Sequence, residues 1–178
     1  MNADFSLLIK TLLTAPLQTA PNQQIISDGL GLFTYRDFVC RLHRLAGALS
    51  REGFGQGDVV GVMDWDTHRY LECFFAVPMM GAVLHTLNVR LSPKDLEYII
   101  NHAEDQIIIV DADVLPLLEV LNGKIPCVRK VVVATEDGFE GWSTELPDPV
   151  DYEAFIEGQP THFDCTAACD SAAKEPGR

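Results

Sequence analysis

The sequence is poor in positive charge and has no apolar run long enough to cross a membrane. Its 178 residues include 13 Lys and Arg against 26 Asp and Glu, and the formal net charge is −13. Because proteins that bind nucleic acid neutralise phosphates with clustered Lys and Arg, we expect no nucleic acid partner. The longest apolar segment covers residues 73–84 and contains Pro78. A membrane-spanning helix needs about 20 apolar residues, so no transmembrane segment is expected.

A secretion signal and a disulfide pattern are also lacking. The opening residues, MNADFSLLIKTLLTAP, have no basic region, and Asp4 and Lys10 interrupt their apolar run. The five cysteines are an odd number, and Cys40 and Cys73 fall within helical apolar patterns, as small core residues do. These features are typical of a reducing compartment, and they predict a cytoplasmic protein.

The common catalytic motifs are missing as well. There is no G-x-S-x-G, H-E-x-x-H or G-x-x-x-x-G-K-[ST] pattern. The glycines of GFGQG resemble a phosphate loop, but they precede a strand instead of following one and opening a helix. Cys165 and Cys169 are too few for a zinc site, to which His162 could add only a third ligand, and their spacing is not that of a redox pair. We therefore name no catalytic residue, no nucleotide-binding residue and no metal ligand.

Four continuously apolar runs alternate with helical patterns along the chain. The runs cover residues 59–63, 82–87, 107–111 and 129–135. The helical patterns follow N-terminal caps at Thr34, at Asp66 or Thr67, and at Ser92, and a further short helix covers residues 114–121. Strands that are apolar throughout are typical of a parallel sheet that is covered on both faces. The predicted fold class is α/β, with a mostly parallel sheet and helices on both faces.

The N-terminal region predicts a helix and a hairpin. Residues 5–13 have helical spacing, and we expect Pro16 to stop this helix. The segment QQIISDGLGLFTYRDF predicts two short strands joined by a tight turn at Gly29 and Gly31.

The C-terminal region is acidic. No Lys or Arg lies between Lys130 and Lys174, whereas Asp and Glu recur there, which favours a solvated surface segment. Residues 151–158 can form one or two helical turns within it. We expect residues 1–160 to form one subdomain and residues 161–178 to be a disordered tail.

Polar side chains gather at the end of one predicted strand. His85 and Thr86 lie near the end of the run at residues 82–87, and Asn88 and Arg90 follow. Parallel sheets bind their ligands beyond the carboxyl ends of the strands, so these four residues are the candidate pocket residues. The alternative is that they only hold the connection in place through backbone hydrogen bonds.

The other histidines are weaker candidates for functional residues. His43, His68 and His102 lie on predicted helices next to polar residues, so we expect them at the surface or at helix ends. His162 lies in the acidic C-terminal region.

Long segments of the chain resemble one known family. LFTYRDFVCRLHRLAGAL, the GDVV strand, the helix that leads into MGAV, the connection LNVRLSP and the strand that ends in IIIVD occur in the expected order. Together they resemble the AMP-forming acyl-CoA synthetases over roughly residues 20–160. The form LHTLNVRLSP is most similar to the medium- and long-chain fatty-acyl-CoA ligases of bacteria. Val89 stands where relatives commonly have proline.

The resemblance implies a two-step reaction for the complete enzymes. They activate a carboxylic acid with ATP to an acyl adenylate and then transfer the acyl group to CoA, with Mg²⁺ as a cofactor. Their phosphate loop would begin shortly after residue 165, and their catalytic lysine lies in a later domain. The chain therefore resembles the incomplete N-terminal part of the adenylate-forming synthetase fold. We expect a truncated ligase that is inactive alone and binds none of these cofactors, with an out-of-frame or truncated tail.

Two other functions stay open at this stage. The chain could be a non-catalytic interaction or dimerisation module, or one half of a split synthetase whose partner is the missing C-terminal portion. A small flavodoxin-like nucleotide binder is a third reading, which the lack of a phosphate loop after the first strand disfavours. The acyl chain length and the oligomeric state do not follow from the sequence.

Overall fold

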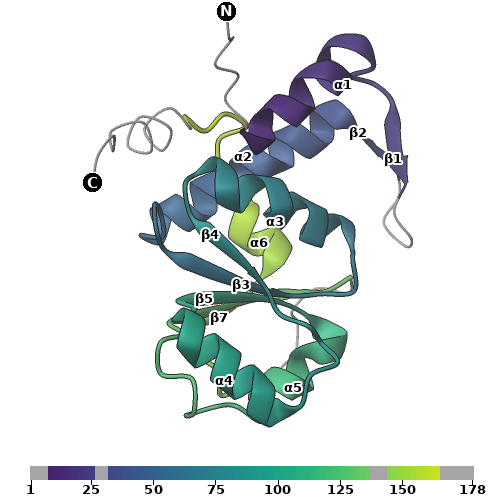
Figure 1. The fold of residues 1–178 in the computed structure, drawn as a ribbon. Coiled ribbons are helices and arrows are strands. Elements are labelled where there is room, and N and C mark those ends of the chain that lie inside the picture. The colour runs from purple at the N-terminus through teal and green to yellow at the C-terminus, as the bar shows by residue number, and fades with distance from the viewer. Residues whose placement is uncertain (1–7, 27–31, 137–143, 165–178) are drawn as a thin grey trace, which may run out of the picture.

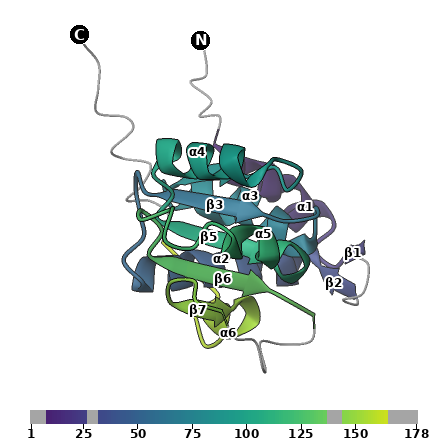
Figure 2. The same cartoon turned by 90° about the horizontal axis from the view of Figure 1, so that it is seen from below.

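A five-stranded parallel sheet forms the centre of the protein in the computed structural model, which describes residues 8–26, 32–136 and 144–164. Each neighbouring pair of strands runs in parallel, in the order β4-β3-β5-β6-β7. Figure 2 shows β3 to β7 side by side in this order. The mostly parallel sheet predicted from the sequence is confirmed. The strands are β3 (Val59–Met63), β4 (Val83–Thr86), β5 (Ile107–Asp111), β6 (Lys130–Ala134) and β7 (Pro149–Asp151).

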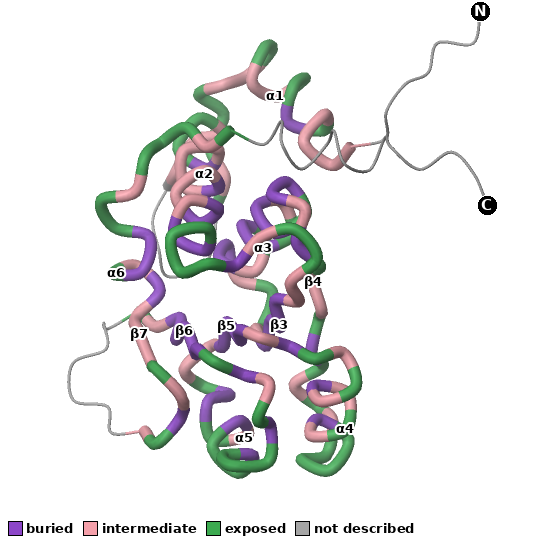
Figure 3. Tube along the Cα trace, turned by 90° about the vertical axis from the view of Figure 1, so that its left-hand side faces the viewer, coloured by how far each residue is buried: buried purple, intermediate pink, exposed green. Residues whose placement is uncertain are grey.

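Helices cover both faces of this sheet, as predicted (Figure 1). On one face lie α2 (Tyr35–Arg51), α3 (His68–Met79) and α6 (Tyr152–Ile156), and on the other lie α4 (Pro93–Ala103), the 3-10 helix η2 (Ala112–Val114) and α5 (Leu115–Glu119). Successive residues of a strand point to opposite faces, so each strand serves two cores. Val132 and Ala134 of β6 pack with the first group of helices, and Val131 and Val133 pack with the second. Figure 3 shows the central strands almost wholly buried.

The strand order contains one reversal. The chain passes from β3 to β4 at one edge, then returns across β3 to build β5, β6 and β7 on the other side. Ligands of such sheets bind where the order reverses, beyond the carboxyl ends of the strands. Here that point lies between β3 and β5. Asp64 directly follows β3, and Asp111 ends β5.

The N-terminal caps predicted for the helices are present in the structure. The Thr34 side chain accepts a hydrogen bond from the Asp37 amide, and the Asp37 carboxylate accepts one from the Thr34 amide, which makes a capping box for α2. Thr67 caps α3, and Ser92 caps α4. The GFGQG segment joins α2 to β3 and lies at the amino end of that strand, so the phosphate-loop reading has no support.

The N-terminal region differs from the prediction at Pro16. A 3-10 helix, η1 (Ile9–Leu13), is followed directly by α1 (Thr14–Thr19), which contains Pro16 in its first turn. The prediction that Pro16 stops the helix was therefore wrong. Amides in the first turn of a helix have no intrahelical partner, so a proline there removes no hydrogen bond. The predicted hairpin is confirmed by antiparallel β1 (Gln24–Ile26) and β2 (Leu32–Thr34), whereas its glycine turn lies outside the described residues.

Two further expectations need correction. The strand predicted as buried at residues 82–87 is an edge strand, β4, in which Val83 is 50% exposed. The acidic region is not a surface segment throughout, because Pro149–Asp151 extend the sheet as β7 and Tyr152 is fully buried. Residues 161–164 also belong to the described part, where the Phe163 amide donates to His43 Nδ1. Cys165 and Cys169 lie outside it. None of the described helices is long and apolar enough to span a membrane.

Candidate functional site

A pocket of about 330 Å³ lies beyond the carboxyl ends of β3 and β4, and we call it the edge pocket. Three of the four candidate residues, Thr86, Asn88 and Arg90, line it. The connections that follow two neighbouring parallel strands emerge at the same edge of the sheet, which brings these residues against the segment after β3. The remaining lining residues are Asp64, Trp65, Asp66, Tyr70, Leu87 and Val89.

The connection after β4 explains how Asn88 and Arg90 are held. The Arg90 amide donates to Asn88 Oδ1 at 2.9 Å, and the Leu91 amide donates to the Asn88 carbonyl at 3.1 Å. Asn88 thus fixes the turn, as the alternative reading of this segment expected. The turn leaves the Arg90 side chain exposed beside the pocket, where its guanidinium forms no ion pair with any described residue.

The opposite wall of the edge pocket is acidic. Asp64 accepts hydrogen bonds from the amide and hydroxyl of Thr67, at 2.9 and 2.8 Å. Burial raises the pKa of Asp64, and these hydrogen bonds only partly oppose that rise. Burial also raises the pKa of Asp111 at the end of β5, and the nearby Asp64 charge adds to the effect. Asp64 and Asp111 thus place two acidic groups at the reversal of the strand order.

The residues of the edge pocket suit binding better than covalent catalysis. The lining residues include an arginine, two aromatic side chains, an amide and two carboxylates, but no histidine, cysteine, serine or lysine. Nucleophilic catalysis needs a nucleophile within reach of a base. The pocket contains the hydroxyls of Thr86 and Tyr70, but neither is hydrogen-bonded to Asp64 or Asp66, whose carboxylates are the bases in this lining. The pocket can bind and orient a polar group, whereas a reaction there would need groups from elsewhere.

His85, the fourth candidate residue, does not line the edge pocket. Neighbouring residues of a strand point to opposite faces, so His85 and Thr86 cannot face the same space. The structure pairs His85 Nδ1 with both carboxylate oxygens of Asp105, at 2.9 and 3.0 Å. Asp105 is fully buried between α4 and β5. Burial raises the pKa of Asp105 to about 6, although the hydrogen bond with His85 opposes that shift.

Replacing Asp105 by asparagine should change how stability depends on pH. The unfolded carboxyl titrates near 3.8 and the folded one near 6, so the folded state retains a proton that the unfolded state has lost. The free energy of unfolding of the wild type, relative to Asp105→Asn, should therefore fall by on the order of 2 kcal/mol between about pH 4 and pH 6. Urea unfolding at several pH values measures this difference. A difference that stays flat would show that folding does not change the pKa of Asp105, and one that rises with pH would show that folding lowers it; either result would contradict the prediction.

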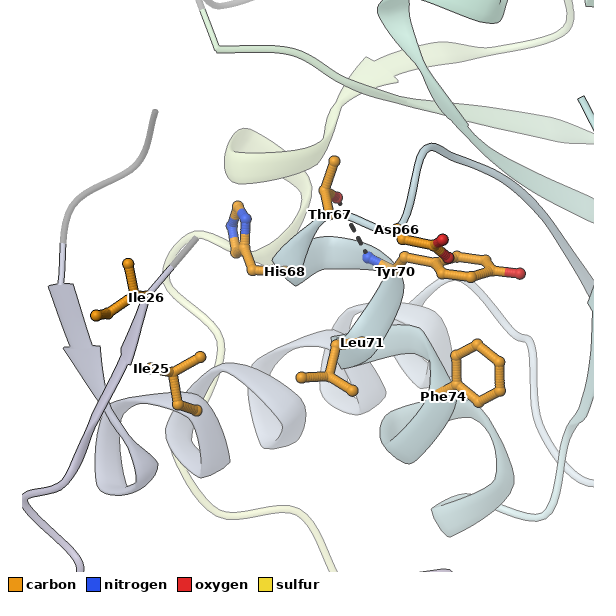
Figure 4. Close-up of a pocket in the computed structure, with 8 residues that line it drawn as sticks. All are labelled: Ile25, Ile26, Asp66, Thr67, His68, Tyr70, Leu71 and Phe74. Atoms are coloured by element: carbon orange, nitrogen blue, oxygen red, sulfur yellow. Dashed lines mark hydrogen bonds between the residues drawn. The ribbon is translucent and has the colours of Figure 1, made fainter. Parts of the chain in front are cut away.

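A second hollow lies between the β1–β2 hairpin and α3 (Figure 4). It measures about 450 Å³. Ile25 and Ile26 of the hairpin and Leu71 and Phe74 of the helix line it, with Ile25 and Leu71 turned toward each other, and Ile26, Leu71 and Phe74 are exposed. We call it the apolar groove. Its lining also contains Asp66, Thr67, His68 and Tyr70, so the apolar side chains adjoin polar ones.

A partly buried charge network joins α2, α3 and α6. Arg41 Nε lies 2.6 Å from Glu72 Oε1, and Arg41 Nη1 lies 2.8 Å from Glu153 Oε2. Arg69 Nε lies 3.0 Å from Glu153 Oε1, and the Tyr152 hydroxyl donates to Glu72 Oε2 at 2.7 Å. Glu72 is fully buried. These five residues, which we call the helix network, tie three helices together over one face of the sheet.

The sequence reasoning did not find the helix network. His68, which lies beside it, was expected at the surface or at a helix end; it is the first residue of α3, which confirms the helix end, but its side chain is only 4% exposed. Phe33 of the hairpin covers the ring at a centroid distance of 5.5 Å. One signal was available: Glu72 precedes Cys73 and lies one turn before Ala76, inside the apolar stripe of α3.

Comparisons with known proteins agree with this fold. The profile of a family described as AMP-binding enzyme matches residues 14–169. A long-chain-fatty-acid–CoA ligase of Thermus thermophilus is 42% identical over 141 residues, which cover 78% of this chain and 25% of that enzyme. A medium-chain-fatty-acid–CoA ligase of Ectopseudomonas oleovorans is 32% identical over 122 residues, or 68% of this chain and 22% of that enzyme.

A solved structure shows the same architecture. The anthranilate CoA ligase AuaEII in complex with anthranoyl-AMP superposes with a TM-score of 0.75 and 25% identity over 86% of this chain and 28% of that one. The chain thus spans about a quarter of the length of the relatives it matches. Since the family profile covers most of the sequence and the parallel sheet agrees with a ligase fold, the chain belongs to the AMP-binding enzyme family of acyl-CoA ligases.

Proposed function

We propose that this chain is the N-terminal portion of a fatty-acyl-CoA ligase that lacks ligase activity on its own. The observation that carries the proposal is its 42% identity to the Thermus thermophilus ligase over only a quarter of that enzyme. In the complete protein, ATP and Mg²⁺ would convert a fatty acid into an acyl adenylate, and CoA would accept the acyl group. A cytoplasmic location is part of the proposal, and the free Cys40, Cys73 and Cys127 support it.

The edge pocket defines the contribution that we propose for this portion. Arg90 and the polar groups of Thr86 and Asn88 would contact a ligand or a neighbouring segment of the complete ligase. His85 would act indirectly, because its bond to Asp105 fastens the edge strand β4 to the start of β5. No hydroxyl of the pocket is hydrogen-bonded to one of its carboxylates, as a nucleophile would be to its base, which supports a role in binding.

Two assays with fatty acids test the proposal. The isolated 178-residue chain should show no ATP–pyrophosphate exchange above a heat-denatured control. A chimaera in which this chain replaces the matching quarter of the Thermus thermophilus ligase should form acyl-CoA, provided that circular dichroism shows it to be folded. Robust exchange by the chain alone would contradict the lack of activity. A folded chimaera that binds ATP but activates no fatty acid would contradict the assignment to a ligase.

A second candidate function is an association module or one half of a split synthetase, which the apolar groove favours. Exposed apolar side chains that adjoin one another commonly mark a surface that another protein covers. Light scattering of the purified chain at increasing concentration would reveal self-association. A stable monomer that binds no hydrophobic dye would exclude this reading.

A further inference from the structure

A second charged pocket, of about 430 Å³, lies among α2, α3, α6 and the carboxyl ends of β6 and β7. It is separate from the edge pocket, with which it shares no lining residue. Phe33 and Thr135 complete a wall that consists otherwise of ionisable side chains. We call it the acceptor pocket; those side chains are Arg41, His68, Arg69, Glu136, Asp151 and Glu153.

Every guanidinium nitrogen of this pocket already donates at least one hydrogen bond. The Arg41 nitrogens Nε, Nη1 and Nη2 donate to Glu72 and Glu153. The Arg69 nitrogens donate to Glu153, to Glu136 at 3.1 Å and to the Thr135 carbonyl at 3.2 Å. An anion such as phosphate or carboxylate would have to approach guanidinium groups that Glu136 and Glu153 already neutralise, against the negative charge of these two carboxylates.

Two buried acceptors, in contrast, have no partner. Asp151 Oδ1 accepts the Ala154 amide and caps α6, but Asp151 Oδ2 is buried without a hydrogen-bond partner among the described residues. His68 Nδ1 is also buried and unpaired, on a side chain that is only 4% exposed. A buried polar atom without a partner costs free energy, so each such atom points to a group that satisfies it.

The environment of His68 determines which of its nitrogens can accept. Nε2 lies 4.0 Å from Glu72 Oε1, which favours the tautomer with the proton on Nε2, directed at the carboxylate. Nδ1 then carries a lone pair. Burial and the neighbouring Arg69 and Arg41 lower the pKa of His68 to about 4, so the ring is neutral at physiological pH. His68 thus offers an acceptor rather than a second donor.

The charge of the pocket also favours a cation. Two arginines face the carboxylates of Glu136, Asp151 and Glu153, and the buried Glu72 adds a fourth negative charge behind them. The sum is two positive against four negative charges. No group of three or more His, Cys, Asp and Glu side chains in the described part is arranged to hold a metal ion. An organic cation that donates hydrogen bonds fits both the charge and the unpaired acceptors.

We propose that the acceptor pocket binds a small primary amine in its ammonium form, which donates hydrogen bonds to His68 Nδ1 and Asp151 Oδ2. The inference goes beyond the proposed ligase function and does not depend on it. A bound ammonium satisfies both orphaned acceptors and reduces the excess negative charge between the three helices. Its occupancy would thereby reinforce the contacts among α2, α3 and α6.

Titration of the full 178-residue chain with methylammonium chloride tests the site. Tetramethylammonium chloride supplies the same charge without an N–H donor, and sodium chloride controls for ionic strength. We expect saturable binding of methylammonium alone, with a millimolar dissociation constant. The ¹⁵N resonance of His68 Nδ1 should shift with the same dissociation constant, because a lone-pair nitrogen responds strongly to an accepted hydrogen bond.

Asp151→Asn is the decisive variant. Its side-chain oxygen can still cap α6, but an amide donor replaces the free acceptor, so methylammonium affinity should fall at least about tenfold. Asp95→Asn makes the same charge change in the first turn of α4, on the other face of the sheet, and should bind as the wild type does. An equal response to tetramethylammonium, a response that does not saturate, or unchanged binding by folded Asp151→Asn would overturn the proposal.

Discussion

Replacement of Glu72 by glutamine should lower the free energy of unfolding by about 3 to 5 kcal/mol, the range observed when one partner of a buried ion pair is removed. Glu72 is fully buried and accepts hydrogen bonds from two Arg41 nitrogens and from the Tyr152 hydroxyl. Glutamine has nearly the same shape, so the variant changes charge and hydrogen bonding with little change in packing. Urea unfolding monitored by circular dichroism measures the loss.

The expected loss of stability arises because glutamine leaves Arg41 without the negative charge of Glu72. Burial already raises the pKa of Glu72, and it is mainly Arg41 that opposes this rise and favours the charged carboxylate. Without that carboxylate, Arg41 keeps only Glu153, which it shares with Arg69. In addition, the glutamine amide group would direct donors at a side chain that itself only donates. The half-buried Arg41 would then lack part of the negative charge that offsets the cost of its burial.

A double-mutant cycle separates the ion pair from a general loss of packing. Arg41→Met combined with Glu72→Gln removes the stranded cation, so the double variant should lose less stability than the sum of the single losses. Glu97→Gln, on α4 across the sheet, is the matched control and should change stability by less than about 0.5 kcal/mol. If Glu72→Gln cost no more than this control, the helix network would contribute nothing to stability.

The extent to which the fold could be predicted depended on whether the signals were local. The caps at Thr34, Thr67 and Ser92 and the apolar runs of β3, β5 and β6 depend on neighbouring residues, so they were visible in the sequence. The strand β7 has only three residues, one of which is acidic, and its extended backbone depends on pairing with β6. That pairing joins residues 131–133 to residues 149–151, so the local pattern of β7 alone does not predict it.

The candidate site, too, was predictable only where its residues are neighbours in the sequence. Thr86, Asn88 and Arg90 were grouped because they end or follow one strand of a parallel sheet, and they do line one pocket; that this pocket binds a ligand stays a prediction. The opposite wall, formed by Asp64 and Tyr70, could not be assigned without knowing that β3 lies beside β4. The helix network could not be predicted from local patterns at all, because its hydrogen bonds join residues that are 31 to 112 positions apart.

Replacement of Gly61 by valine should lower the free energy of unfolding by about 3 kcal/mol, at the upper end of what overpacking a core costs. Gly61 lies in the middle of β3 and faces the core under α4. A Cβ atom there would lie 3.1 Å from Leu87 Cδ1, 3.2 Å from Asp105 Oδ2 and 3.2 Å from Ile108 Cγ1. These neighbours come from three different segments, and the two methyl groups of valine crowd them further.

Strand propensity opposes this cost, because valine favours extended backbone and glycine does not, by about 1 kcal/mol. Crowding should prevail, since Ile108 is fixed in the central strand β5 and Asp105 is held by His85. Displacement of Asp105 should also disturb the His85 imidazole resonances, a change that a loss of strand propensity would not produce. Gly55→Val serves as the control, because a Cβ atom at Gly55 meets nothing within 4 Å. If Gly61→Val were as stable as Gly55→Val, the core would accommodate the valine side chain at no cost in stability. If the His85 resonances stayed unchanged in Gly61→Val, Gly61 would not be required for the approach of Asp105 to β3.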